Sequence, residues 1–196
     1  MLRLPVKVNS ITNLSDARYC AGMGVEMIGF SVSEKHARHI TTEKVNGITG
    51  WLSGVKVVSE AFFGEKPDHL MLHAKSISAS VIEIDACMYK PLSLLDFHLI
   101  LRLNVGEWET VKSRIPDDAL LHLMLEKTDL IHTEAIRAIC ASKSTLLNLS
   151  KLELPEIDTL LTLITPYGVS LDGGNELSPG LSDFEFLAEV LEYLEA

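Results

Sequence analysis

Several classes of protein are excluded by what this chain lacks. Its cysteines, Cys20, Cys87 and Cys140, are odd in number and widely separated, so we expect neither a disulfide framework nor a C-x-x-C metal site. Lys and Arg number 17 against 27 Asp and Glu, which gives a formal charge of -10, and the sequence contains no basic stripe. Nucleic acid is therefore not an expected partner.

Long apolar runs are also missing. No stretch approaches the roughly 18 apolar residues that span a bilayer, and the N-terminus lacks the basic start, apolar run and small-residue cleavage site of a signal peptide. We therefore expect no membrane association and a cytoplasmic protein. His36 and His39 are close together in a predicted loop, but without an evident third ligand they predict no metal site.

The chain does contain enough apolar sequence for one sizeable core. It is 196 residues long and 47% apolar, which suits a single domain over residues 1–196. No linker, low-complexity tract or block of like charge divides it.

Short apolar runs alternate with helical patterns along the whole chain. The runs predict eight strands, at 5–11, 26–32, 55–60, 81–85, 98–103, 119–124, 145–149 and 168–172. Helical patterns lie between and after them, at 13–23, 41–53, 67–79, 91–96, 107–115, 132–142, 154–165 and 181–195. This order is typical of α/β proteins with a parallel sheet. It predicts a (β/α)8 TIM-type barrel with short loops, because such barrels usually need about 250 residues.

Three segments resemble one enzyme family. The stretch 6–18 reads VKVNSITNLSDAR and resembles the opening K-I/V-C-G-I/L-T-x-x-x-D-A of phosphoribosylanthranilate isomerases. The stretch 36–40, HARHI, is similar to their S-P-R-x-V/I, and 171–183, LDGGNELSPGLSD, is similar to their closing S-S-G-V-E-x-x-P-G-x-K-D. The segments follow the family's order over nearly the whole chain. The resemblance implies a TIM-type barrel of the tryptophan biosynthesis family, and we expect no cofactor.

The resemblance also identifies two catalytic positions, and neither carries a titratable side chain here. The family's general base is the cysteine of the opening pattern, and that position is Asn9, whose amide cannot take a proton near neutral pH. The family's acid lies in a pattern D-A-L-L-L-D-T/S, and the matching stretch 118–124 places Leu123 there. His122 is adjacent but is expected to face the helical layer. Asp85 and His122 are the weak substitutes for the lost pair.

The fourth predicted strand carries two acidic residues that share a face. Glu83 and Asp85 are two apart, so in a barrel interior they would be buried like charges. One interpretation is a new general acid or base. The other, which we favour, is an interior ion pair with Lys7 or Arg102, because structural ion pairs also perturb pKa values without catalysis.

Ligand-binding residues are expected at the C-terminal ends of the strands. The resemblance implies that Lys7 lies on the floor of the pocket and that Arg38 contacts a carboxylate or phosphate. It also implies a phosphate held by turns after the last two strands. Gly173 and Gly174 supply one such turn, and Lys151 stands in the other. The alternative is that the glycines form an ordinary tight turn and that Lys151 is solvated.

Three functions are compatible with the sequence. The first, which we favour, is a phosphoribosylanthranilate isomerase-like barrel that binds a phosphorylated small molecule, with the Amadori isomerase chemistry weakened or lost. The second is an active isomerase, an intramolecular oxidoreductase of the aldose–ketose type, with displaced acid and base residues. The third is a non-enzymatic barrel that serves as a protein partner. For the oligomeric state we expect a monomer or a homodimer.

Overall fold

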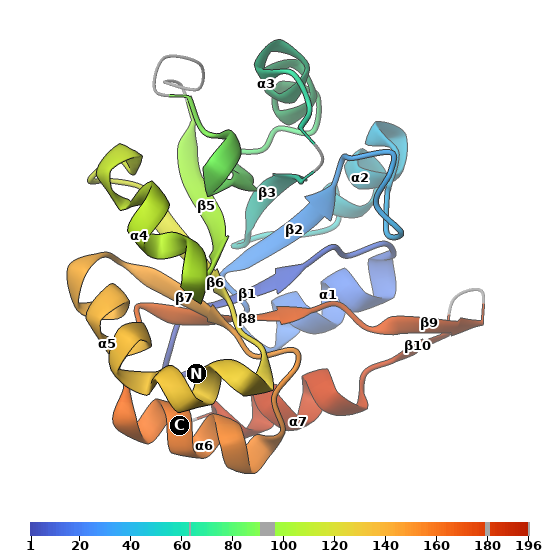
Figure 1. Ribbon diagram of the computed structural model, residues 1–196. Helices are drawn as coiled ribbons and strands as arrows, with labels where there is room; N and C mark the ends of the chain where they lie inside the picture. Colours follow the sequence, from blue (N-terminus) through green and yellow to red (C-terminus); the bar gives the residue numbers. More distant parts are fainter. Residues whose placement is uncertain (63, 91–96, 179–180, 196) are drawn as a thin grey trace.

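Eight parallel strands close into a barrel (Figure 1). The computed structural model describes residues 1–62, 64–90, 97–178 and 181–195. The strand order follows the sequence, and β1 pairs with β8 to close the ring. The strands are β1 (Val6–Asn9), β2 (Met27–Ser31), β3 (Lys56–Ala61), β4 (Val81–Asp85), β5 (His98–Asn104), β6 (Leu120–Met124), β7 (Thr145–Asn148) and β8 (Gly168–Asp172). The predicted TIM-type barrel is confirmed.

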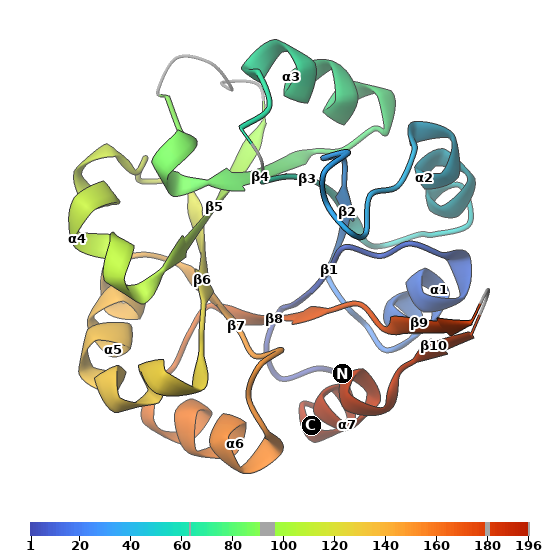
Figure 2. The same ribbon diagram turned by 45° about the vertical axis from the view of Figure 1, so that its right-hand side comes forward.

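Helices surround the ring of strands, as Figure 2 shows. They are α1 (Leu14–Gly22), α2 (Thr42–Thr49), α3 (Pro67–Ser76), α4 (Trp108–Val111), α5 (Thr133–Ser142), α6 (Leu154–Leu163) and α7 (Glu185–Tyr193). Helix α1 begins after Asn13, whose Oδ1 accepts the N–H of Asp16 at 2.9 Å. This cap satisfies the Asp16 amide, which would otherwise lack a partner within the helix. Helix α1 therefore begins a few residues after the end of β1.

The helices differ from the prediction in two places, and the predicted helix at 91–96 lies outside the described residues. The one at 107–115 is divided into the 3-10 turn Val105–Glu107, α4 and the 3-10 turn Lys112–Arg114. The last helix is predicted from 181, but the chain first forms an antiparallel hairpin of β9 (Asn175–Ser178) and β10 (Leu181–Asp183). This hairpin extends beyond the end of β8 beside α1 in both views (Figures 1 and 2).

Alternation along the strands separates two apolar regions. One fills the barrel interior near the N-terminal ends of the strands and consists of Met27, Val58, Val81, Ile100 and Leu146, with Leu120 packed against them. The other lies between the strands and the helices and contains the outward-facing residues, among them Val6, Val8, Leu121 and Leu123. The rest of the barrel interior is left to polar side chains.

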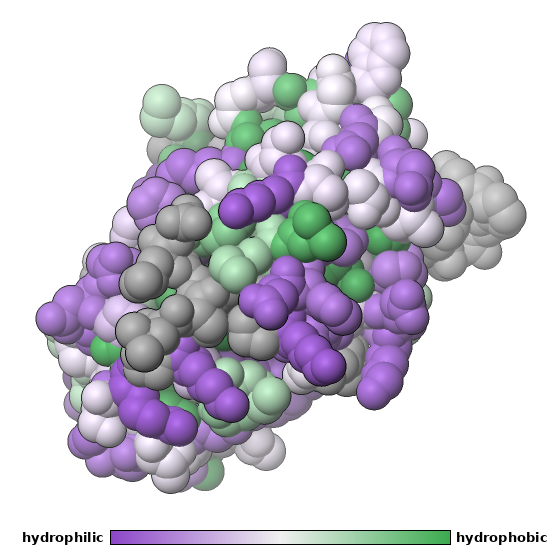
Figure 3. Space-filling view, turned by 90° about the horizontal axis from the view of Figure 1, so that it is seen from above, coloured by the Kyte–Doolittle hydropathy of each residue, from purple (hydrophilic) through white to green (hydrophobic). Residues whose placement is uncertain are grey.

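The outer surface is mixed, and the two ends of the chain lie together. Leu2 forms a bridge with Glu195. The face seen in Figure 3 is largely hydrophilic, with small groups of hydrophobic residues. Among the helices that the structure describes, none has the length and apolar character needed to cross a membrane.

Candidate functional site

A network of charged side chains fills the barrel interior beyond the apolar layer. Lys7 Nζ lies 2.6 Å from Glu60 Oε1 and 2.7 Å from Glu83 Oε2, and all three side chains are fully buried. The pairing of β3 with β4 places Glu60 beside Glu83, and Lys7 reaches both from β1. The interior ion pair that we favoured for Glu83 is present, and a second carboxylate shares the same lysine.

A histidine on β6 extends this network. His122 Nδ1 lies 2.5 Å from Glu83 Oε1, and His122 Nε2 lies 2.6 Å from Ser170 Oγ. Because an ionised carboxylate only accepts, Nδ1–H donates to Glu83. The expectation that His122 faces the helical layer is wrong. The apolar neighbours Leu121 and Leu123 pack outward, and strand alternation then turns His122 inward.

Leu123 consequently has no place in the site. It is fully buried in the core between the strands and the helices. The residue at the end of β6 that lines the barrel mouth is Met124. Its thioether does not transfer protons near neutral pH, so Met124 is not a general acid.

Glu60 also holds the backbone at the end of β1. Its Oε2 accepts hydrogen bonds from the Ser10 N–H at 3.0 Å and from Ser10 Oγ at 2.8 Å. Ser10 has a φ of 51°, a left-handed conformation that costs a non-glycine residue about 1–2 kcal/mol. Gly29 makes room for this carboxylate, since a Cβ there would lie 1.7 Å from Glu60 Oε1. We did not predict Glu60 or Ser10, although an acidic residue ending an apolar strand was a signal.

The network shifts the pKa values of its members in opposite directions. Burial alone would lower the pKa of Lys7, but the charges of Glu60 and Glu83 outweigh it and raise that pKa above its ordinary value. Burial alone would raise the pKa of Glu83, but Lys7 and His122 hold it well below its usual range. Both groups are therefore charged inside the barrel at neutral pH.

A cavity of about 300 Å³ opens at the C-terminal ends of the strands and borders this network. We call it the mouth cavity. Its main polar lining residues are Asn9, His36, Arg38, Arg102, His122 and Asp172. Burial lowers the pKa of His36, which favours its neutral ring at neutral pH.

Asn9 is held at both ends of its amide. Its Oδ1 accepts from Lys7 Nζ at 2.5 Å, and its Nδ2 donates to Asp172 Oδ1 at 2.9 Å. Because an ammonium only donates and a carboxylate only accepts, the two partners fix the orientation of the amide. Asn9 is thus a positioned polar group with no basic atom.

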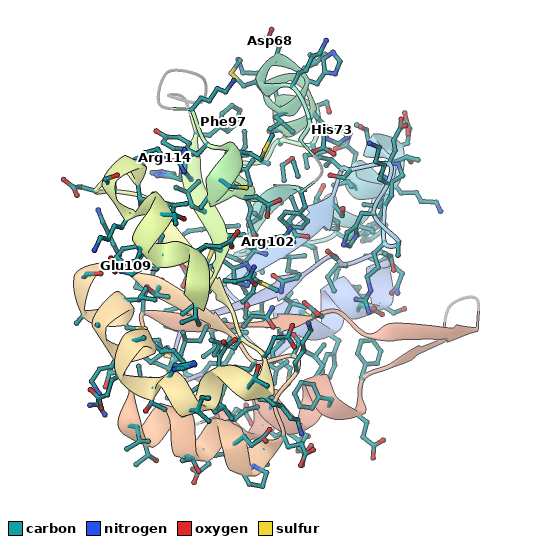
Figure 4. All side chains as sticks on the ribbon, in the orientation of Figure 1. Asp68, His73, Phe97, Arg102, Glu109 and Arg114 are labelled. Carbon is teal, nitrogen blue, oxygen red and sulfur yellow. The ribbon has the colours of Figure 1, made fainter. Side chains whose placement is uncertain are left out.

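The second acidic residue of β4 is paired as well. Arg102 Nε and Nη2 lie 2.8 Å and 2.7 Å from Asp85 Oδ1, and the guanidinium lies 3.5 Å from the centre of the Phe62 ring. Figure 4 labels Arg102 near the middle of the barrel. Burial raises the pKa of Asp85, although Arg102 opposes the shift. Asp85 is therefore engaged in an ion pair, which favours a structural role.

The turn after β8 uses its amides within the protein. Gly173 N–H donates to the Asn9 carbonyl at 2.9 Å, and Asp172 N–H donates to Ser150 Oγ at 2.7 Å. The Gly173 carbonyl accepts from Arg38 Nη1 at 2.5 Å. The chain then continues into β9, so no helix begins at this turn. These contacts agree with the tight-turn alternative and leave the expected phosphate site without two of its amides.

The remaining predicted ligand residues are separated in space. Lys151 is exposed and pairs with Glu126, as expected of a solvated lysine. Gly174 lines a second cavity outside the barrel ring, and Arg38 lines both cavities. The structure thus brings six predicted residues together at one end of the barrel, namely Lys7, Asn9, Arg38, Asp85, His122 and Gly173.

His36 and His39, the two histidines of the second loop, have different surroundings. The ring of His36 packs edge-on against Phe62, with 6.0 Å between ring centres, and His39 is exposed. Within the described part of the chain, no three His, Cys, Asp or Glu side chains are grouped so as to hold a metal ion.

Comparison with known proteins finds a similar isomerase. No family model matches the chain. The N-(5'-phosphoribosyl)anthranilate isomerase of Aquifex aeolicus (strain VF5) is 24% identical over 196 residues, covering 95% of this chain and 96% of the relative. The chain is therefore similar to a phosphoribosylanthranilate isomerase over nearly the whole length of both proteins.

Solved structures of phosphoribosylanthranilate isomerases share the barrel. One, in complex with reduced 1-(o-carboxyphenylamino)-1-deoxyribulose 5-phosphate, has a TM-score of 0.76 at 19% identity, covering 96% of this chain and 97% of that chain. The isomerase from Thermus thermophilus has a TM-score of 0.77 at 18% identity, with 97% and 98% covered. At these identities the structural likeness establishes the fold alone.

Proposed function

We propose that this protein binds a small phosphorylated molecule at the barrel mouth and no longer performs the Amadori isomerisation with the base and acid of its family. The observation that carries the proposal is the hydrogen bonding of Asn9. This residue stands at the position of the family's base, and its amide is hydrogen-bonded to Lys7 and Asp172. It offers no atom that takes a proton near neutral pH.

The opposite side of the mouth supports the same conclusion. The inward-facing residue at the end of β6 is Met124, which cannot act as a general acid. General acid or base catalysis contributes about 10² to 10⁴ per group. Loss of both groups would therefore lower turnover by about 10⁴ or more.

The arginines support binding of an anion. Arg38 and Arg102 both line the mouth cavity, and a guanidinium suits a carboxylate or a phosphate. A solved relative holds a ligand that carries a 5-phosphate. Asp172 would repel an anion placed beside the Gly173 turn, so we expect an anionic ligand to avoid that turn.

Two measurements test the proposal. With phosphoribosylanthranilate as substrate, chromatography should detect no Amadori product above a protein-free control. Turnover within about a hundredfold of an ordinary enzyme, whose kcat is roughly 10 s⁻¹, would contradict the loss of activity. In calorimetric titration ribose 5-phosphate should bind saturably, and Arg102→Ala should weaken it while the exposed control Lys112→Ala should not. Absence of saturable binding would contradict the ligand-binding proposal.

The second candidate, an active isomerase with displaced groups, has one observation in its favour. His122 lines the mouth cavity, and Glu83 orients its Nδ1, as in sites where histidine transfers protons. If product does form, His122→Asn should abolish it and Met124→Leu should leave it. The partner-protein alternative has less support, because the mouth cavity is open and lined by charged groups.

A further inference from the structure

A second cavity, which we call the outer cavity, lies beside the first turns of α1 and α2. Its volume is about 640 Å³, against about 300 Å³ for the mouth cavity. Its polar lining consists of Thr12, Asn13, Arg38, His39 and Lys44. Ile40 and Ile48 form an apolar wall. The space is therefore large enough for part of a small molecule that has both a polar and an apolar side.

The charge of the outer cavity is opposite to that of the whole chain. The chain has a formal charge of -10, yet the described residues that line the outer cavity include Arg38 and Lys44 and no Asp or Glu. The mouth cavity, in contrast, includes Asp172. Lys44 is exposed, and its ammonium forms no ion pair within the part of the chain that the structure describes. This local excess of positive charge favours an anionic group.

The two cavities adjoin each other. Ala37 and Arg38 line both of them, and Arg38 is held by its hydrogen bond to the Gly173 carbonyl. The turn after β8 cannot offer the amides of Asp172 and Gly173 to a phosphate, because both already donate within the protein. The outer cavity lies next to this turn and carries the positive charges of Arg38 and Lys44. It is therefore the nearer alternative place for a phosphate.

We infer that the outer cavity is the subsite for the phosphate group of the ligand, with Lys44 as its counter-ion, and that the rest of the ligand extends past Arg38 into the mouth cavity. This inference rests on the proposed function and gives it a ligand class: an elongated phosphate monoester with a polar body. The carbon atoms next to the ester oxygen would pack on Ile40 and Ile48.

Calorimetric titration at fixed ionic strength tests this subsite, with ribose 5-phosphate and ribose as probes. Lys44→Ala should weaken ribose 5-phosphate binding about tenfold, because a charge-assisted hydrogen bond to phosphate is lost. Lys44→Arg should retain most of the affinity. The matched control is Lys75→Ala on α3, which removes the same charge from an exposed helix position outside both cavities. Any weak affinity for ribose should be unchanged in all variants.

The outcomes separate the two proposals. If Lys44→Ala binds ribose 5-phosphate like the unmodified protein while Arg102→Ala does not, the outer subsite is wrong and the mouth still binds the ligand. Equal weakening by Lys44→Ala and Lys75→Ala would be an effect of net charge and would also overturn the subsite. If the unmodified protein shows no saturable binding of ribose 5-phosphate, both proposals fail.

Discussion

In the barrel interior Lys7, Glu60 and Glu83 are fully buried, whereas at the mouth the side chains of Asp85 and Arg102 each keep 25% of their surface exposed. Both regions contain carboxylates paired with cations at similar distances. The surroundings differ, because Lys7, Glu60 and Glu83 expose no side-chain surface, whereas Arg102 lines the open mouth cavity.

Because the two regions differ in burial, we expect substitutions in the interior to affect the stability of the fold and substitutions at the mouth to affect ligand binding. Removing one partner of a buried ion pair typically costs about 3–5 kcal/mol, whereas an exposed pair contributes about 0–1 kcal/mol. Changes to the interior network should therefore alter the free energy of unfolding. Changes at the mouth should alter ligand affinity and leave the fold largely intact.

The orientation of β6 gives the sharpest contrast between the core and the mouth. Leu123→Asp should lower the free energy of unfolding by about 4 kcal/mol or more, because a carboxylate would replace a leucine fully buried in the outer core. Met124→Asp should cost only about 1 kcal/mol, since this position lines the mouth cavity. Urea unfolding measures both, and similar losses would mean that the strand is oriented otherwise.

Replacement of Lys7 should have the second-largest effect on the free energy of unfolding. Lys7→Met leaves Glu60 and Glu83 buried beside an apolar side chain, and we expect a loss of about 3–5 kcal/mol in unfolding free energy. The control is Lys56→Met, whose ion pair with Glu26 lies on the surface and should contribute less than about 1 kcal/mol. A loss for Lys7→Met no larger than that of the control would show that the network does not stabilise the fold.

The acid dependence of stability should report on Glu83. Because its pKa in the folded protein lies below the ordinary value near 4.5, the ionised carboxylate stabilises the fold above about pH 4.5 and this contribution is lost as the pH falls further. The stability difference between the unmodified protein and Glu83→Gln should be constant from about pH 6 to 8. Below about pH 4.5 it should shrink by up to about 1.4 kcal/mol per pH unit. Parallel curves down to pH 3 would contradict the depressed pKa.

The smallest effect is expected at the end of β1. Ser10→Ala removes the Oγ hydrogen bond to Glu60 and keeps the left-handed backbone, so it should cost about 1 kcal/mol. Ser10→Gly loses the same bond but relieves the backbone, and should be more stable than Ser10→Ala by about 1 kcal/mol. Thermal unfolding of the two variants checks this order, and the reverse order would exclude strain at this position.

The candidate site was predictable only in part. That Lys7 and Asn9 share a face follows from the period of a strand, and that Glu83 needs a cation follows from its burial in an apolar run. The sequence did not predict that His122 points into the barrel. Which side chains of β6 point inward depends on which of them pack against the helices. The internal hydrogen bonds of the Asp172 and Gly173 amides did not follow from the sequence either, since their partners come from β1 and the segment after β7.

The sequence by itself determined the repeated strand and helix units, the barrel and the amide side chain at position 9, because local periodicity and residue chemistry are carried by neighbouring residues. Only the tertiary structure decided that Glu60 and His122 join Lys7 and Glu83, that Met124 rather than Leu123 faces the mouth, and that the Gly173 amide is already used. The physical reason is that these contacts join side chains and amides far apart in sequence. Closure of the ring brings them within hydrogen-bond distance.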